Sequence, residues 1–159
     1  MHSSTPRAGL YVHVPFCARK CLYCDFYSCV SETGASLQRQ YVDSVLGEWQ
    51  QLRANWSADS VVWDTLYLGG GTPSQLSPAL LARLLSELTT LLSPSAAAEM
   101  EITCELNPDD VGPPLLDALQ ASSLNRISLG VQALDDESLR LLGRRHDVLG
   151  ALSAIELLV

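Results

Sequence analysis

The order of apolar runs and helical patterns along the chain predicts alternating strands and helices. Short runs rich in β-branched and aromatic residues predict the strands. Apolar residues spaced three and four positions apart predict the helices between them. The predicted strands are 10–16, 60–68, 101–106 and 125–132, and the predicted helices are 37–56, 77–92, 113–121, 135–142 and 148–159. Strands and helices that alternate in this way indicate an α/β fold with a parallel sheet and right-handed crossovers.

Alternate positions within the four strands differ in polarity. One phase is nearly all apolar, from Val12 and Val14 in the first strand to Leu129 and Val131 in the last. The opposite phase carries Tyr11, His13, Tyr67, Gly69, Thr103, Glu105, Asn107, Ser128, Gly130 and Gln132. A doubly wound sheet would be apolar on both phases, because helices cover both of its faces. The pattern therefore favours part of a β/α barrel with a ligand-binding interior at the C-terminal ends of its strands. A one-layer sheet with a solvated face is the alternative.

Three of the five cysteines lie in one loop after the first strand, as Cys17-x3-Cys21-x2-Cys24. Three thiolates on a tight loop can hold three corners of an iron–sulfur cube and leave the fourth iron open, whereas a closed cluster takes four ligands. A structural zinc site also needs four ligands. The fourth would have to be Cys29, Cys104 or a histidine, and none stands at paired spacing. The spacing favours a cluster, with zinc or free structural thiols as the alternatives.

Polar residues at the ends of the following strands are further candidates for ligand binding. Glycines 69–71, followed by Thr72, end the second strand, and glycine lets the backbone approach a ligand closely. Glu105 would pair with a ligand ammonium, and Gln132 can hydrogen-bond a ribose or a carboxylate. Arg144 follows the next helix, where a charge complementing the helix dipole is its plainer explanation. Each residue alone has such a structural explanation, but all of them converge on one end of one sheet.

Composition and charge exclude several classes of protein. A formal charge of −8, with Lys20 as the only lysine, argues against a general nucleic-acid role, which needs clustered basic residues. No apolar run approaches the roughly 20 residues that a membrane span needs. The N-terminus lacks the apolar stretch of a secretory signal, and an odd cysteine count argues against a disulfide framework. We therefore expect a cytoplasmic protein whose cysteines are free thiols or metal ligands.

The pattern also predicts the domain organisation. We expect residues 1–9 to be disordered and residues 10–159 to form the N-terminal part of one larger core domain. The chain stops at Val159 inside an apolar helical pattern, with no residue that would end a helix. This ending indicates a truncated domain.

Taken together, these motifs resemble the radical S-adenosylmethionine superfamily, whose signature CxxxCxxC stands here as Cys17, Cys21 and Cys24. Within that superfamily, the stretches YVHVPFCxxKCxYCDF, LGGGTPS, EITCELNP and NRISLGVQALDDESLRLLGRRH resemble the HemW-type heme chaperones. Those proteins are related to oxygen-independent coproporphyrinogen III oxidase. The resemblance runs from Tyr11 to the last residue. It implies an incomplete (β/α)6 barrel, TIM-like, of which about four β/α units are present here.

The resemblance also implies the cofactors and the residues that hold them. The three cysteines would ligate a [4Fe–4S] cluster, and S-adenosylmethionine would chelate the open iron through its amino and carboxylate groups. Electron transfer from a reducing partner would then cleave the sulfonium to methionine and a 5′-deoxyadenosyl radical. The positions that match the family's cofactor contacts are Tyr11, Tyr23, Gly70, Gly71, Thr72, Glu105, Gln132 and Arg144.

One position separates two branches of the family. The oxidase branch carries a fourth cysteine two residues after the third, and this chain has Phe26 there. The difference favours the chaperone branch, which is taken to bind heme and hand it to other proteins. Coproporphyrinogen oxidase, an enzyme of porphyrin biosynthesis, is the alternative. His13 and His146 are weak candidates for a heme ligand.

Overall fold

The structure is a computed structural model that describes residues 6–30, 34–55, 61–92 and 100–159. Its main sheet has four parallel strands in the order β1-β4-β5-β6. These strands are β1 (Arg7–Val14), β4 (Val62–Gly70), β5 (Glu101–Leu106) and β6 (Arg126–Leu129). The helices are α1 (Ala35–Ala54), α2 (Pro78–Leu92), α3 (Pro113–Gln120), α4 (Asp136–Leu141) and α5 (Val148–Leu158). The parallel order confirms the predicted α/β fold.

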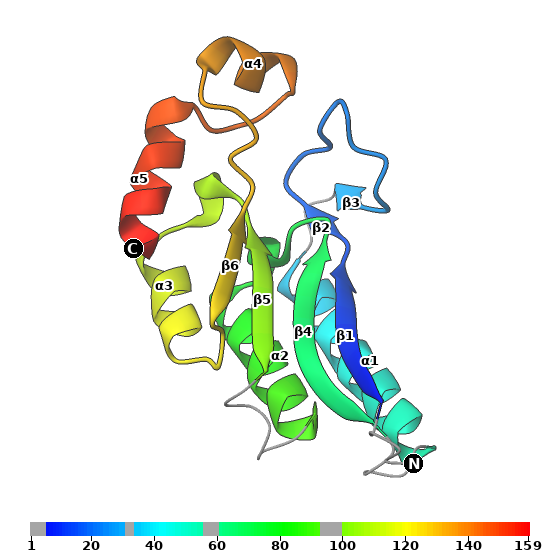
Figure 1. Cartoon of the computed structure of the whole chain (residues 1–159). Coiled ribbons are helices and arrows are strands. Elements are labelled where there is room, and N and C mark those ends of the chain that lie inside the picture. The colour runs from blue at the N-terminus through cyan, green and yellow to red at the C-terminus, as the bar shows by residue number, and fades with distance from the viewer. Residues whose placement is uncertain (1–5, 31–33, 56–60, 93–99) are drawn as a thin grey trace.

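Helices α1 and α2 lie against one face of the sheet, and α3 packs beside α2 (Figure 1). The apolar phase of the strands faces these helices, so Val14, Leu68 and Ile102 are fully buried. The polar phase lies on the opposite face, which no helix of the described ranges covers (Figure 1). Tyr11 on that face keeps 54% of its surface exposed. The alternation read from the sequence therefore separates the core from an open polar face.

Strand β1 begins earlier than expected. Residues 7–9, predicted to be disordered, belong to the sheet because their backbone pairs with the start of β4. The Arg7 guanidinium also donates to the Asp64 carboxylate at 2.7 Å, across the same two strands. Residues 1–5, the predicted helix end at 56 and the predicted strand start at 60 lie outside the described residues.

Strand β6 ends earlier than expected, at Leu129 rather than Gln132. The Gly130 N–H still donates to a carbonyl of β5, the Leu106 oxygen, at 2.8 Å. Two tight turns follow, in which Val131 and Ala133 each donate to the carbonyl two residues earlier at 2.9 Å. Gln132 has a φ of 70°, in the left-handed region that a strand cannot use. The backbone therefore leaves the sheet just before the predicted ligand residue.

A second, smaller sheet closes the base of the cysteine loop. Strands β2 (Phe16–Cys17) and β3 (Cys29–Val30) pair in parallel, and the Cys29 N–H donates to the Pro15 carbonyl at 2.7 Å. Sequence patterns did not predict these strands, because two residues are too few to show a period of two. Separately, none of the helices in the described ranges is long and apolar enough to cross a membrane.

Candidate functional site

A pocket of about 240 Å³ lies where the C-terminal ends of the strands meet the cysteine loop. All but one of the predicted site residues line it: Cys17, Cys21, Tyr23, Cys24, Gly70, Gly71, Thr72, Glu105, Gln132 and Arg144. Tyr11 is the exception. It stacks on Tyr67 with ring centroids 6.0 Å apart, and its hydroxyl lies 3.1 Å from Nδ1 of His13. The fold thus brings together residues from all four β/α units, with Tyr11 beside the pocket rather than in it.

The cysteine loop is held in shape by its own polar groups. The Cys24 N–H donates to the Cys21 carbonyl at 3.2 Å, which makes a turn between two of the cysteines. The Lys20 ammonium donates to the Phe26 carbonyl at 2.8 Å and to the Ser28 hydroxyl at 3.3 Å. The single lysine therefore fastens the two sides of the loop together.

The three cysteine side chains are half-buried and are free thiols. The Cys17 sulfur lies 3.6 Å from the Thr72 hydroxyl oxygen, and the Cys21 sulfur accepts a hydrogen bond from Arg144 at 3.4 Å. Within the part of the chain that the structure describes, no three His, Cys, Asp or Glu side chains are grouped closely enough to hold one metal ion. The sulfur atoms of Cys17 and Cys21 therefore have different polar neighbours.

Glycine is required where β4 ends. Gly70 has a φ of 111°, and a Cβ there would lie 2.6 Å from the His13 ring. A Cβ on Gly71 would lie 2.8 Å from the backbone of Pro15, and the Gly71 N–H donates to the Val14 carbonyl at 2.8 Å. The glycines were predicted to let the backbone approach a ligand closely. In the structure they let the end of β4 approach the His13 ring and the backbone of Pro15 closely.

Glu105 is oriented by two hydrogen bonds. Its Oε1 accepts from the Tyr67 hydroxyl at 2.7 Å, and its Oε2 accepts from the Gly70 N–H at 3.2 Å. The bond to Glu105 raises the pKa of Tyr67, so its hydroxyl remains a donor at neutral pH. A carboxylate has about four acceptor positions, so capacity remains for a cationic ligand group.

Asn107 connects the two sides of the pocket. Its amide nitrogen donates to the Thr72 hydroxyl at 3.2 Å, and its amide oxygen accepts from Arg144 at 2.7 Å. Arg144 also donates to the Gly130 carbonyl at 2.8 Å. Sequence reasoning placed Asn107 and Tyr67 on the polar phase but gave them no role. Their position on that phase was the only signal that could have identified them.

Arg144 has a donor nitrogen that the described residues leave unpaired. Its Nε is buried and has no hydrogen-bond partner among the described residues. A buried donor left unpaired costs about 1–3 kcal/mol, so such groups normally have an acceptor. Tyr23 lines the same pocket, and burial raises the pKa of its phenol, which keeps that side chain neutral. A ligand carboxylate would supply the acceptor that Arg144 lacks.

The two histidines are held by protein atoms. Both ring nitrogens of His13 are in hydrogen-bond range of a partner, since Nε2 lies 2.8 Å from the Tyr27 carbonyl and Nδ1 faces Tyr11. The His146 side chain is only 1% exposed, with Nε2 3.0 Å from the Val131 carbonyl. Neither arrangement supports the weak suggestion that one of them is a heme ligand.

The other two cysteines are not part of the pocket lining. Cys104 is fully buried in β5, as its place on the apolar phase predicted. Burial raises the pKa of its thiol to about 12. Because the thiolate is the form that binds metal, Cys104 is unsuited to be a ligand. Cys29 lies in β3 at the base of the loop.

The fold and the pocket define the class of protein. Residues 11–159 match the model of the Radical SAM superfamily, and the chain belongs to that family. Its curated relatives include the heme chaperone HemW of Bacillus subtilis, 37% identical over 138 residues, which are 86% of this chain and 35% of that protein. HemW of Escherichia coli is 38% identical over 141 residues, 89% of this chain and 36% of that protein.

Two further similarities extend the comparison. The mouse radical S-adenosyl methionine domain-containing protein 1, mitochondrial, is 35% identical over 153 residues, 96% of this chain and 33% of its own length. Coproporphyrinogen III oxidase (HemN) of Escherichia coli superposes with a TM-score of 0.80 at 29% identity, covering 96% of this chain and 34% of that one. This match confirms a partial TIM-like radical SAM barrel. The chain spans about a third of the length of the curated relatives it matches.

Proposed function

We propose that the protein holds a [4Fe–4S] cluster on Cys17, Cys21 and Cys24 and binds S-adenosylmethionine in the adjoining pocket. The observation that carries this proposal is a three-cysteine loop facing a pocket that contains both an oriented carboxylate and a buried, unpaired guanidinium nitrogen. A cube takes one thiolate on each of three different irons, so the three sulfur atoms do not have to meet at one metal ion. When bound, the reduced cluster supplies the electron that cleaves the sulfonium.

The pocket residues can hold both charged ends of the methionine part of the ligand. Glu105, held by Tyr67 and Gly70, can accept from the ammonium group. The unpaired Nε of Arg144 can donate to the carboxylate. Opposite charges placed in this way offset the cost of burying the ligand's own charges. Gln132, also in the lining, is available to hydrogen-bond the ribose.

For the whole protein we propose the HemW-type function, which is to bind heme and transfer it to heme proteins. The similarity to bacterial HemW proteins supports this proposal. Phe26 supports it as well, because it lines the pocket, 62% exposed, at the position where the oxidase branch carries a fourth cysteine. The five free cysteines suit a reducing compartment, and we propose the cytoplasm as the site of action.

The alternative is an oxygen-independent coproporphyrinogen III oxidase of porphyrin biosynthesis. The superposition on HemN, with its TM-score of 0.80, favours this candidate. Both candidate functions use the cluster and S-adenosylmethionine, so binding of these cofactors cannot distinguish them. Turnover of coproporphyrinogen can. The whole protein is incubated anaerobically with reductant, S-adenosylmethionine and coproporphyrinogen. We expect heme binding and no vinyl product, and formation of that product would reject the chaperone proposal.

The cluster itself is tested by anaerobic reconstitution followed by iron, sulfide and zinc analysis. We expect about four irons and four sulfides per chain, as in a [4Fe–4S] centre. Cys21→Ser should lower both, whereas Cys29→Ser, a matched change at the base of the same loop, should retain them. Zinc bound without iron or sulfide would reject the cluster assignment.

A further inference from the structure

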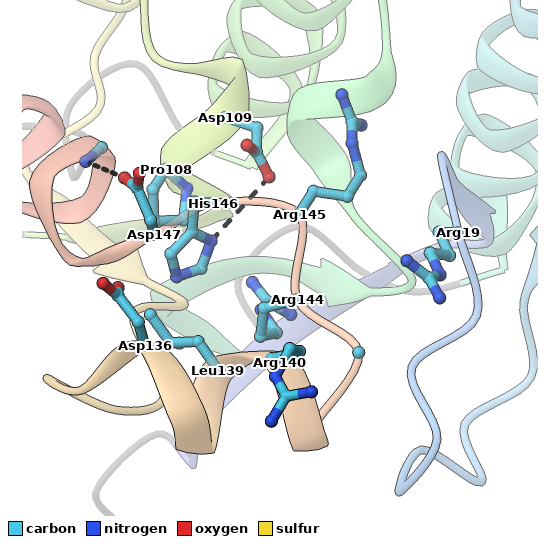
Figure 2. A pocket seen from close by; sticks show the side chains of 12 residues that line it. Arg19, Pro108, Asp109, Asp136, Leu139, Arg140, Arg144, Arg145, His146 and Asp147 are labelled. Carbon is cyan, nitrogen blue, oxygen red and sulfur yellow. Dashed lines mark hydrogen bonds and ion pairs between the residues drawn. The ribbon is translucent and has the colours of Figure 1, made fainter.

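His146 is a buried polar side chain to which the proposed function gives no role. It lies in the wall of a second pocket, of about 490 Å³, between η2 (Pro108–Asp110), α4 and the start of α5 (Figure 2). Its side chain is only 1% exposed. Burying a polar ring costs free energy unless its nitrogens are hydrogen-bonded, so the contacts of this ring show what it does.

One nitrogen of the His146 ring makes the hydrogen bond that orients it. Nε2 lies 3.0 Å from the Val131 carbonyl oxygen. Since a carbonyl can only accept, Nε2 carries a proton and is the donor. Nδ1 has no hydrogen-bond partner among the described residues, and the Asp109 carboxylate lies 3.8 Å away from it (Figure 2). The ring is therefore oriented by the Val131 carbonyl.

That carbonyl belongs to the tight turns in which the chain leaves the sheet after β6. The same oxygen accepts the Ala133 N–H at 2.9 Å, so it has two donors. Gln132 lies between these two residues and, among the described residues, is the only non-glycine with a positive φ, at 70°. This conformation is unfavourable for a residue with a side chain and persists only where the surroundings fix it.

Two side chains from one short segment fix the backbone immediately before Gln132. Arg144 donates to the Gly130 carbonyl at 2.8 Å, and His146, two residues further on, donates to the Val131 carbonyl. These two carbonyls are successive and lie just beyond the last residue of β6. Backbone groups that have left a sheet need other partners when they are not in water. Arg144 and His146 supply those partners.

The segment that carries these two side chains is itself fixed at both ends. At its start, Gly143 follows α4 with a φ of 73°, the left-handed conformation typical of a helix C-terminus. At its end, the Asp147 carboxylate accepts the Gly150 N–H at 2.8 Å and caps α5. His146 therefore acts on the turn from a rigid support.

We propose that His146 is a positioning residue of the cofactor pocket, which holds the turn that places Gln132 in the lining. Gln132 lines that pocket and His146 does not, so His146 acts only through the backbone at Val131. What Gln132 binds rests on the proposed function. The effect of His146 on the turn does not, and it is tested without any ligand.

The test follows the turn by hydrogen–deuterium exchange at single amides of the whole protein, with no ligand added. The Ala133 amide is the reporter, because its acceptor is the carbonyl that His146 also bonds. His146→Phe keeps a ring but removes the donor. It should speed exchange at Ala133 about fivefold, the factor that one typical hydrogen bond contributes to an equilibrium.

Two further measurements separate the hydrogen bond from packing. His146→Gln places an amide donor near the position of Nε2 and should return the Ala133 rate toward that of the wild type. The Gly130 amide, which donates to the Leu106 carbonyl of β5 at 2.8 Å, is an internal reference whose rate should not change.

Thr89→Val is the matched control. The Thr89 hydroxyl is buried in α2 and donates to the Leu85 carbonyl at 2.7 Å, so this change also removes a side-chain donor from a backbone carbonyl. It should leave exchange at Ala133 unchanged, because it lies outside the turn.

A double variant tests the link to the backbone of Gln132. Glycine adopts a positive φ without strain, so the turn should need less support in Gln132→Gly. His146→Phe should then speed exchange at Ala133 less in the Gln132→Gly background than in the wild type. An equal effect in both backgrounds would refute the link.

Equal Ala133 exchange in wild type and His146→Phe would overturn the inference. A His146→Gln variant that exchanges as fast as His146→Phe would overturn it too, since the ring would then act by packing alone. If the phenylalanine variant does not fold, His146→Asn replaces it, because its shorter side chain brings the amide near the Nδ1 position instead. Failure of the proposed function would appear as zinc without iron or sulfide on reconstitution, and would leave the exchange result standing.

Discussion

Single side chains set the geometry of the cofactor pocket before any ligand binds. Tyr67 is the clearest case, because its hydroxyl fixes one oxygen of Glu105 while the Gly70 N–H fixes the other. Without the hydroxyl, the carboxylate would keep only the longer of its two bonds, at 3.2 Å. The loss would be one of orientation, since the charge of Glu105 would remain.

We therefore expect Tyr67→Phe to weaken the binding of S-adenosylmethionine to the cluster-loaded protein. A typical hydrogen bond contributes about 1 kcal/mol, which corresponds to roughly a fivefold loss of affinity. Equilibrium dialysis with labelled S-adenosylmethionine measures the change. Tyr41→Phe is the matched control, because the Tyr41 hydroxyl donates to the His13 backbone carbonyl at 2.7 Å and does not contact Glu105. Unchanged affinity in Tyr67→Phe would contradict a positioning role for the hydroxyl.

At the scale of an element, the end of β4 depends on glycine for packing against β1. Gly70 combines a φ of 111° with a position where a Cβ would meet the His13 ring at 2.6 Å. The ring cannot easily move aside, since its nitrogens already face Tyr11 and Tyr27. Both strain and overlap therefore oppose a side chain at this position.

Gly70→Ala should accordingly lower the free energy of unfolding by about 1–3 kcal/mol or more, the usual cost of a strained backbone position. Gly47→Ala is a matched change in the interior of α1, where a Cβ would meet nothing within 4 Å. It should raise the free energy of unfolding by about 0.5–1 kcal/mol, because alanine has the higher helix propensity. Denaturant unfolding of both variants measures the two effects, and a shift of equal sign would refute this account of Gly70.

At the scale of the whole molecule, the sheet has two open sides. Among the described residues, β1 and β6 each pair with one neighbour only. Large apolar side chains are also exposed in the segments that follow β6 in the chain, with Leu134 at 67%, Leu149 at 74% and Leu157 at 52%. Unpaired strand edges and exposed apolar surface both promote association between chains.

The chain of 159 residues, prepared alone, is therefore expected to self-associate as its concentration rises. Size-exclusion chromatography with light scattering measures this directly. Leu149→Glu should reduce the association by replacing exposed apolar surface with charge. A monomer at every concentration, with a sharp and reversible thermal transition, would show that the open sides are tolerated.

The order of elements, the core face and most of the candidate site could be predicted from the sequence alone. These features follow from local rules, such as the period of two in the strands, the spacing of Leu residues in α2 and the cysteine spacing in one loop. Glu105 was identified in the same way, because a carboxylate on the polar phase of a strand stands out against its neighbours.

The contacts between those residues could not be predicted in this way, because they form only in the folded chain. Asn107 joins Thr72 to Arg144, and Arg144 reaches Cys21, which is 123 positions away in the chain. The bend at Gln132 is equally invisible in any local pattern. Such contacts depend on side-chain geometry and on the pairing of distant strands, and these are set by the packing of the whole sheet.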